Sequence, residues 1–190
     1  MSRYPDFIDR LLLHEDTLRE PLPPSQASEF SVKCILRIRA ADDAALLGGQ
    51  TPQPGAPLGL LRGGLYYFHN ALEDSHKAFA DDAGATAAYW HGMVHRREGD
   101  FENARYWMRR AGEHPAFQEA HGRSSDASPH MARQTNWDAF LFIHLCGQFK
   151  YGASEYRNEI AHLQRVEFAV FFDYVWRQCV EEPRRAAARP

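Results

Sequence analysis

Two stretches of the sequence place metal-binding residue types at the spacing of successive helical turns. In each stretch the three residues are separated by intervals of three and four, so they share one face of a helix. The stretches are His69/Glu73/His76 and His91/His95/Glu98. If the two helices are antiparallel neighbours joined by a turn at residues 80–85, four imidazoles and two carboxylates converge. These ligand types suit zinc, iron or manganese, so the pattern defines a candidate divalent-metal site.

The same residues admit a second interpretation. Glu73 and His76 form the Glu-x-x-His pair of di-iron helical bundles, and the pair recurs at Glu159 and His162. A chain with 10 histidines produces such spacings by chance, however. The residues can instead form a buried network of His–Glu and Arg–Glu hydrogen bonds that clamps the helices together. We favour the network, because every feature of the metal site also has a structural explanation.

Arginine and aromatic side chains on the same helices are the candidate ligand-binding residues. The set is Arg96, Arg97, Arg110, Tyr66, Trp90 and Trp107. The arginines could hold a phosphate or carboxylate through paired hydrogen bonds, although nearby acidic residues favour solvated ion pairs. The aromatic residues could line a pocket, although packing in the core is the simpler explanation for them.

Familiar nucleophile and nucleotide motifs are absent from the sequence. It contains no G-x-S-x-G elbow, no phosphate-binding glycine loop and no dinucleotide fingerprint. The zinc-protease motif H-E-x-x-H is also missing, because Gly-Met-Val separates His91 from His95. Cys34, Cys146 and Cys179 stand far apart in apolar helical contexts, as core thiols do. The sequence therefore assigns no catalytic residue.

The composition is that of a soluble protein with one sizeable core. The 190 residues are 44% hydrophobic and 13% aromatic, and the net charge is −3 with both signs mixed along the chain. No basic field exists to hold nucleic acid or an anionic membrane, so neither is an expected partner. No signal-peptide pattern and no apolar run of ~20 residues is present. With three isolated cysteines, these features predict a cytoplasmic protein.

Apolar periodicity and turn residues predict an all-α fold of antiparallel helical hairpins packed in layers. Residues 50–57 are expected to form a loop and residues 118–134 a polar surface loop. A single domain over residues 1–182 and a flexible tail at 183–190 complete the prediction. Some strand character is left open for residues 32–38. Helices are predicted over residues 4–14, 32–47, 58–79, 86–98, 101–111, 137–149 and 154–180.

The central segment resembles known helical units. Residues 88–115 resemble one tetratricopeptide unit, a helix–turn–helix repeat of roughly 34 residues. The positions that carry this resemblance are Gly92, Gly99-Asp100-Phe101, Ala104, Ala111 and Pro115. Only one clear copy is present, which supports the geometry of a hairpin more than a peptide-binding array of about three repeats.

The same segment is similar to a family of bacterial and fungal all-helical proteins to which no activity is assigned. The shared pattern reads WHG-x-x-HRRE-x-D…NA-x-YW…HP and is preceded by Glu73-Asp74-Ser75-His76. Family members often have the letters REPD where this chain has Arg97-Glu98-Gly99-Asp100. The resemblance implies a helical unit and names no reaction.

Two functions of different classes remain. The first is a protein- or ligand-binding module centred on the hairpin at residues 58–115, with a protein, a small anionic ligand or a second copy of the chain as partner. The second is a metal-dependent enzyme of hydrolase or oxygenase type, in which Glu73 or Glu98 is a ligand or base and Arg96 or Arg97 orients an anionic substrate. We favour the first function.

Overall fold

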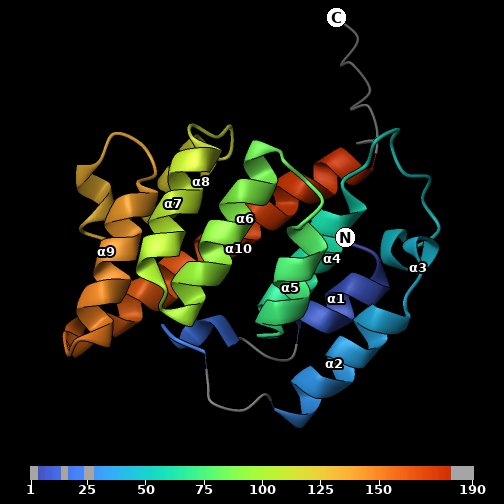
Figure 1. Ribbon diagram of the computed structural model, residues 1–190, viewed down its shortest axis with the longest axis horizontal. Helices are drawn as coiled ribbons and strands as arrows, with labels where there is room; N and C mark the ends of the chain where they lie inside the picture. The colour runs from blue at the N-terminus through green and yellow to red at the C-terminus, as the bar shows by residue number, and fades with distance from the viewer. Residues whose placement is uncertain (1–3, 14–16, 24–27, 181–190) are drawn as a thin grey trace, which may run out of the picture.

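The computed structural model describes residues 4–13, 17–23 and 28–180 (Figure 1). These residues form ten α-helices, three short 3-10 helices and no strand, which confirms the predicted all-α class. The α-helices are α1 (Asp6–Leu12), α2 (Glu29–Ala40), α3 (Asp43–Leu47), α4 (Leu58–Phe68), α5 (Leu72–Phe79), α6 (Ala85–Glu98), α7 (Phe101–Ala111), α8 (Phe117–Ser124), α9 (Ala139–Lys150) and α10 (Arg157–Cys179). The 3-10 helices are η1 (Thr17–Arg19), η2 (Met131–Arg133) and η3 (Ser154–Tyr156).

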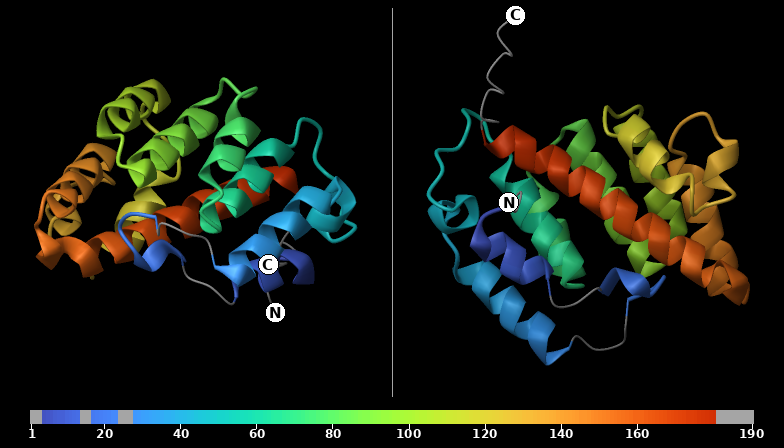
Figure 2. Two further views of the ribbon diagram at one scale, coloured as in Figure 1. Left: turned by 60° about the horizontal axis from the view of Figure 1, so that its bottom comes forward. Right: turned by 180° about the vertical axis from the view of Figure 1, so that it is seen from behind.

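Helix α10 is the element on which the other helices are assembled. It has 23 residues and runs diagonally across the molecule, as the view from behind shows most clearly (Figure 2). It packs against α4, α8, α9 and η1. Its buried residues lie on almost every side of the helix, so α10 is enclosed by the elements around it.

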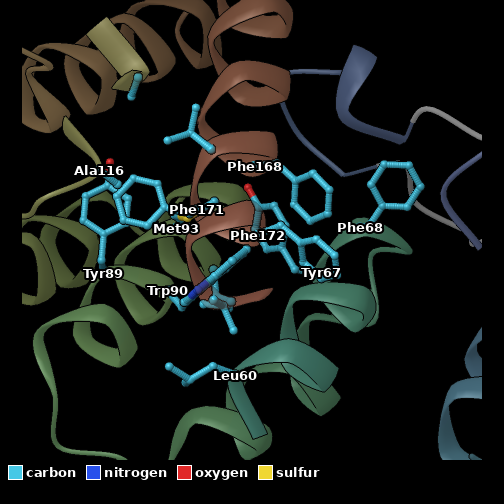
Figure 3. Close-up of a cluster of buried hydrophobic side chains, with 14 of the residues drawn as sticks. Leu60, Tyr67, Phe68, Tyr89, Trp90, Met93, Ala116, Phe168, Phe171 and Phe172 are labelled. Atoms are coloured by element: carbon cyan, nitrogen blue, oxygen red, sulfur yellow. The ribbon is translucent and has the colours of Figure 1, made fainter. Parts of the chain in front are cut away.

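Aromatic rings fill the space between α10 and the helices that cross it (Figure 3). The rings of Tyr89 and Phe171 stack in parallel with their centroids 3.9 Å apart. Trp90 of α6 lies edge-on to Tyr67 of α4 and to Phe168 of α10. Rings from three helices therefore interlock in one layer of the core, which fixes the relative positions of those helices.

The single helix predicted over residues 58–79 is wrong, because the chain breaks at residues 69–71. Asn70 has a φ of +57°, the left-handed conformation that ends a helix. Helix α5 then folds back on α4, and the Ser75 hydroxyl donates to the Gly63 carbonyl over 2.9 Å. A Cβ atom at Gly63 would lie 2.1 Å from the Phe79 ring, so only glycine permits this approach. The helical spacing of apolar residues continues from Phe68 to Leu72 across the break, so the sequence pattern does not show that the helix ends there.

The next two helices lie where the sequence predicts them. Gly99, with a φ of +76°, ends α6, and the Asp100 side chain caps α7 by accepting from the Asn103 N–H. A Cβ atom at Gly92 would lie 2.8 Å from Cε of Met108, so this glycine lets α6 and α7 pack closely. The hairpin is confirmed, whereas its relation to a tetratricopeptide unit stays a prediction. Thr86 does not cap α6, because the N-cap residue is Gly84.

Three other boundaries differ from the predictions. The helix predicted over residues 32–47 begins earlier, at the Ser28 cap, and divides where Asp42 caps α3. Ser154 begins a 3-10 turn, and α10 starts at Arg157 without a side-chain cap. The first helix ends at Leu12, and His14 lies outside the described residues.

The polar surface loop predicted over residues 118–134 is also wrong. This segment contains α8 and η2, and α8 packs against α10 through Phe117 and Ala120. Its apolar residues are too few to produce a clear helical period. Its polar side chains are held within the protein, since His121 Nε2 lies 3.2 Å from the Met131 carbonyl and 2.9 Å from the Gln134 carbonyl.

One hydrophobic cluster contains buried residues from Ile8 to Val180. The predicted domain boundary at residue 182 and the tail at 183–190 lie outside the described residues. Within the part of the chain that the structure describes, no helix combines the length and apolar character needed to cross a bilayer.

Candidate functional site

A buried ion pair joins α6 to α10. Arg96 is 1% exposed and Glu167 is 0% exposed. The guanidinium contacts both carboxylate oxygens, with Nη1 2.8 Å from Oε1 and Nη2 bonded to Oε2. The guanidinium carbon also lies 3.9 Å from the centre of the Phe142 ring of α9. Burial alone lowers the pKa of Arg96, but the Glu167 carboxylate outweighs it and raises that pKa above its usual value.

Two further side chains extend the ion pair toward the surface. The Tyr89 hydroxyl donates to Oε1 of Glu167 over 2.7 Å, and Nε1 of Trp137 donates to the Tyr89 hydroxyl over 2.7 Å. Burial, together with the charge of Glu167, raises the pKa of Tyr89 well above its usual value. This chain of hydrogen bonds fixes Trp137, which precedes α9, to the centre of the core. No sequence pattern predicts these hydrogen bonds, because the residues that form them lie 48 and 78 positions apart.

Arg97 points from α6 to the other side and holds the N-terminal segment. It is 0% exposed. Its Nη2 donates to the Thr17 carbonyl over 2.5 Å and to Oδ1 of Asn70 over 3.0 Å, and its Nη1 donates to the Glu20 carbonyl and to Oε1 of Gln164. Burial lowers the pKa of Arg97. This one guanidinium therefore connects η1, the turn between α4 and α5, and α10.

These contacts correct the roles expected for the two arginines. Arg96 and Arg97 were candidates for binding an anion or, alternatively, for forming solvated ion pairs. Both are buried and bonded within the protein, so neither guanidinium can donate a pair of hydrogen bonds to a ligand that enters from solvent. The Arg–Glu hydrogen bond of the predicted clamping network is present, but its glutamate comes from α10 and not from the hairpin.

Three of the predicted imidazoles come together between α5 and α6. The His76 ring centre lies 4.7 Å from that of His91 and 5.3 Å from that of His95. His91 stacks on Trp107 of α7, with their ring centres 4.2 Å apart. Its Nδ1 lies 3.0 Å from the Ala87 carbonyl, which can only accept, so Nδ1 carries the proton. Burial is the main cause of the lowered pKa of His91. The hydrogen bond to Ala87 raises this pKa, and the neighbouring His76 and His95 lower it.

Of the other predicted metal ligands, His69 and Glu73 have partners away from these rings, whereas Glu98 contacts His95. His69 ends α4, and its Nδ1 lies 3.4 Å from the Ser31 hydroxyl. Glu73 is exposed and pairs with Lys77 over 2.6 Å. Oε2 of Glu98 lies 3.3 Å from Nδ1 of His95. The triplet of residues 69, 73 and 76 does not share one helical face, because the chain breaks between α4 and α5.

No group of three or more histidine, cysteine, aspartate or glutamate residues in the described ranges is arranged to hold a metal ion. The second Glu-x-x-His pair also has other partners. The Glu159 carboxylate bonds to the Ser128 hydroxyl and lies 2.9 Å from Nδ1 of His130. It anchors η2 to α10.

The predicted aromatic ligand-binding residues divide into core and surface. Trp90 is fully buried and Tyr66 is nearly so, and burial is the main cause of the raised pKa of Tyr66. Trp107 is half-buried, and Arg110, which is exposed, lies with its guanidinium carbon 5.5 Å from the Trp107 ring centre. Of the six predicted ligand-binding residues, only this pair is accessible from solvent.

A cavity that the sequence analysis missed lies between α7 and the segment before α9. Its volume is about 540 Å³. Because Met108, Arg109 and Gly112 line it, it faces the side of α7 opposite to Trp107 and Arg110. Its four buried lining residues, here called the floor, are apolar, and its more exposed lining residues, here called the rim, are polar apart from Gly112 and Phe140. The lining residues are Met108, Arg109, Gly112, Glu113, Phe117, Gln134, Thr135, Asn136, Trp137, Asp138, Ala139 and Phe140.

A larger cavity of about 980 Å³ lies between the loop at residues 53–57 and the C-terminal end of α10. Its apolar lining is limited to Pro54, Pro57, Leu60 and Val180, with no aromatic ring. The smaller cavity has three aromatic residues in its lining and walls anchored in the core. We therefore take the smaller cavity, called the α7–α9 pocket below, as the candidate site.

His114, next to the α7–α9 pocket, is buried in a neutral form. Its Nδ1 accepts from the Ala116 N–H over 3.1 Å, so the proton lies on Nε2, which is 3.1 Å from the Thr86 hydroxyl. Its ring centre lies 4.7 Å from those of Phe171 and Tyr174. Burial lowers the pKa of His114 to about 4.

Removing one charge of the buried ion pair tests its structural role. We expect Glu167→Gln to lower the free energy of unfolding by about 3–5 kcal/mol, because Arg96 is left as a buried charge without a counterion. The double variant Arg96→Met/Glu167→Leu should recover much of this loss. Urea unfolding measures both variants, with Glu119→Gln on the surface as the control. A loss below about 1 kcal/mol for Glu167→Gln would contradict the role.

The lowered pKa of His114 predicts how stability depends on pH. The pKa of His114 is about 4 in the folded protein and 6.5 for a free histidine. Between these two pH values the unfolded chain therefore binds a proton at His114 and the folded protein does not. The free energy of unfolding should therefore fall by about 3 kcal/mol as the pH drops from 6.5 to 4. His114→Asn keeps an acceptor for Ala116 and should remove this slope. Unfolding curves of both proteins at several pH values give the difference, and a difference independent of pH would refute the assignment.

Comparisons with known proteins do not identify a function, so the function has to be inferred from the geometry of the site. Searches of family models, curated proteins and solved structures returned no match. The resemblance of residues 88–115 to a helical family therefore stays a prediction.

Proposed function

We propose that this protein is a ligand-binding module whose α7–α9 pocket takes a small molecule with an apolar, ring-sized body. One observation carries the proposal: an apolar floor lies beneath a polar rim in a cavity of about 540 Å³, within the usual size of small-molecule sites. Met108, Phe117, Trp137 and Ala139 form the floor, and each is buried from solvent.

The anchoring of the pocket walls supports this proposal. One wall is α7, which is packed closely on α6 through Gly92. The opposite wall contains Trp137, which is bonded through Tyr89 to the buried ion pair. The loop above is held by His121, which lies within hydrogen-bond distance of the Gln134 carbonyl. Walls that are fixed before binding reduce the entropy lost when a ligand binds.

The pocket also offers an exposed aromatic side chain. Phe140 is 42% exposed at the rim. A buried apolar contact with it would stabilise a bound ring, because aromatic pairs contribute beyond the area that they bury. The proposed module thus keeps the predicted hairpin as its support and uses the face of α7 away from the histidines.

Binding of an uncharged aromatic probe tests the pocket. We expect benzyl alcohol to shift the amide resonances of residues 108–113 and 134–140 in ¹H–¹⁵N spectra, with saturation. Phe140→Ala should weaken binding about tenfold, because the variant loses an apolar contact with the ring. Tyr106→Ala is the matched control, since Tyr106 is a 51% exposed aromatic residue of α7 outside the pocket lining. Shifts elsewhere, or equal effects of the two variants, would reject the pocket.

The metal-dependent enzyme is the second candidate function, and the contact of His76 with His91 and His95 favours it. Because Nδ1 of His91 carries the proton, its Nε2 has a free lone pair, as a metal ligand needs.

Metal analysis separates the two candidate functions. For the binding module we expect far less than one equivalent of zinc, iron or manganese in untagged protein expressed with added metals. Elemental mass spectrometry measures this content. One equivalent of metal that is lost in a folded His91→Ala/His95→Ala variant would instead support the enzyme.

A further inference from the structure

The charges around the α7–α9 pocket specify its ligand more closely, on the basis of the proposed function. We infer that the pocket selects a positively charged ligand, an ammonium group that carries aromatic or alkyl substituents. The small anionic ligand expected from the sequence relied largely on Arg96 and Arg97, which are buried and bonded within the protein.

Aromatic residues are the first feature that favours a cation. Phe117, at the start of α8, and Trp137 and Phe140, around the start of α9, contribute to the lining from two separate segments of the chain. The face of an aromatic ring carries negative electrostatic potential, so rings around a cavity attract ammonium groups, and most strongly those whose alkyl substituents weaken hydration. The buried apolar part of the lining also disfavours a carboxylate, which would lose its water there without gaining a donor from Met108, Phe117 or Ala139.

The carboxylates at the rim are the second feature. Glu113 and Asp138 line the pocket together with one cation, Arg109, so the formal charge of the lining is negative. Asp138 caps α9 by accepting from the N–H groups of Phe140 and Leu141. The positive end of the α9 dipole corresponds to about half a charge, which offsets only part of that carboxylate.

The end of α7 is the third feature. Gly112 is the C-cap residue of α7 and lies in the lining, so the negative end of this helix dipole lies beside the pocket. Gly112 has a φ of +62°, and no atom lies within 4 Å of the position that a Cβ would occupy. Open space therefore lies beside the backbone at this position, and the partial negative charge of the helix end adds to the charge of Glu113.

Arg109 is the one group of the lining that opposes a cation. It is exposed, and no carboxylate in the described ranges forms an ion pair with it. A ligand anion that used Arg109 would reverse the preference, so the experiment includes an anion and a variant of this arginine.

Three probes that share a benzyl group but differ in charge test the inference. They are benzyltrimethylammonium, benzyl alcohol and phenylacetate, titrated at low ionic strength and followed by ¹H–¹⁵N spectra. We expect the cation to bind about fivefold more tightly than the alcohol, and phenylacetate to bind more weakly than the alcohol. If none of the probes shifts the pocket resonances, the proposed function fails. If all three bind equally, or the anion binds most tightly, only the charge preference is overturned.

Variants of the rim assign the preference to named groups. Glu113→Gln should reduce the ratio of cation to alcohol affinity about threefold, with both probes titrated into the same variant. Arg109→Gln should raise the same ratio. Glu102→Gln is the matched control, because it removes one carboxylate from the other end of α7, outside the pocket lining. An equal change with Glu102→Gln would show a response to net charge alone and would overturn the role of Glu113.

Discussion

The Arg96–Glu167 ion pair is the interaction around which the helices are arranged. Two charges removed from water cost several kcal/mol each unless their remaining hydrogen-bonding groups are satisfied. Glu167 meets this demand by accepting from Arg96 and from Tyr89. The Phe142 ring packs against the guanidinium, so the pair also determines where α9 lies. Helices α6, α9 and α10 can satisfy this centre in only a narrow range of positions.

The adjacent arginine extends the same constraint to the start of the chain. Consecutive residues of a helix point about 100° apart, so Arg96 and Arg97 face different neighbours. Arg97 binds carbonyl groups of the segment at residues 17–20, whose Leu18 side chain is buried in the core. Gln164 of α10 donates to the Leu18 and Glu20 carbonyl groups as well, so two side chains hold this short segment. The Arg-Arg dipeptide is thus a structural centre and not a surface for anions.

The walls of the α7–α9 pocket are held by the buried ion pair, but neither Arg96 nor Glu167 lines the pocket. Trp137 joins the pocket wall to Glu167 through Tyr89, and α7 lies between the pocket and the histidine rings. The histidines and the pocket therefore occupy opposite sides of one helix. The first cluster is compact and stacked on Trp107, whereas the second is an open cavity with rings and carboxylates in its lining.

The sequence by itself determined the helical class and the α6–α7 hairpin with its turn at Gly99 and Asp100. Local periodicity and the residues Gly99 and Asp100 encode these features, because helix ends depend on neighbours along the chain. It also indicated that His76, His91 and His95 meet across two helices. The break at Asn70 escaped prediction because the apolar spacing runs through it, and helix α8 escaped it because α8 depends on packing against α10, which is distant in the sequence.

Tertiary structure alone decided the partners of Arg96 and Arg97 and the existence of the pocket. Glu167 lies 71 positions from Arg96, and Trp137 lies 48 positions from Tyr89. No spacing rule connects residues at such separations, because the turns between helices set which faces meet. A cavity arises where those faces leave space, so the α7–α9 pocket is a property of the packed helices and not of any one segment.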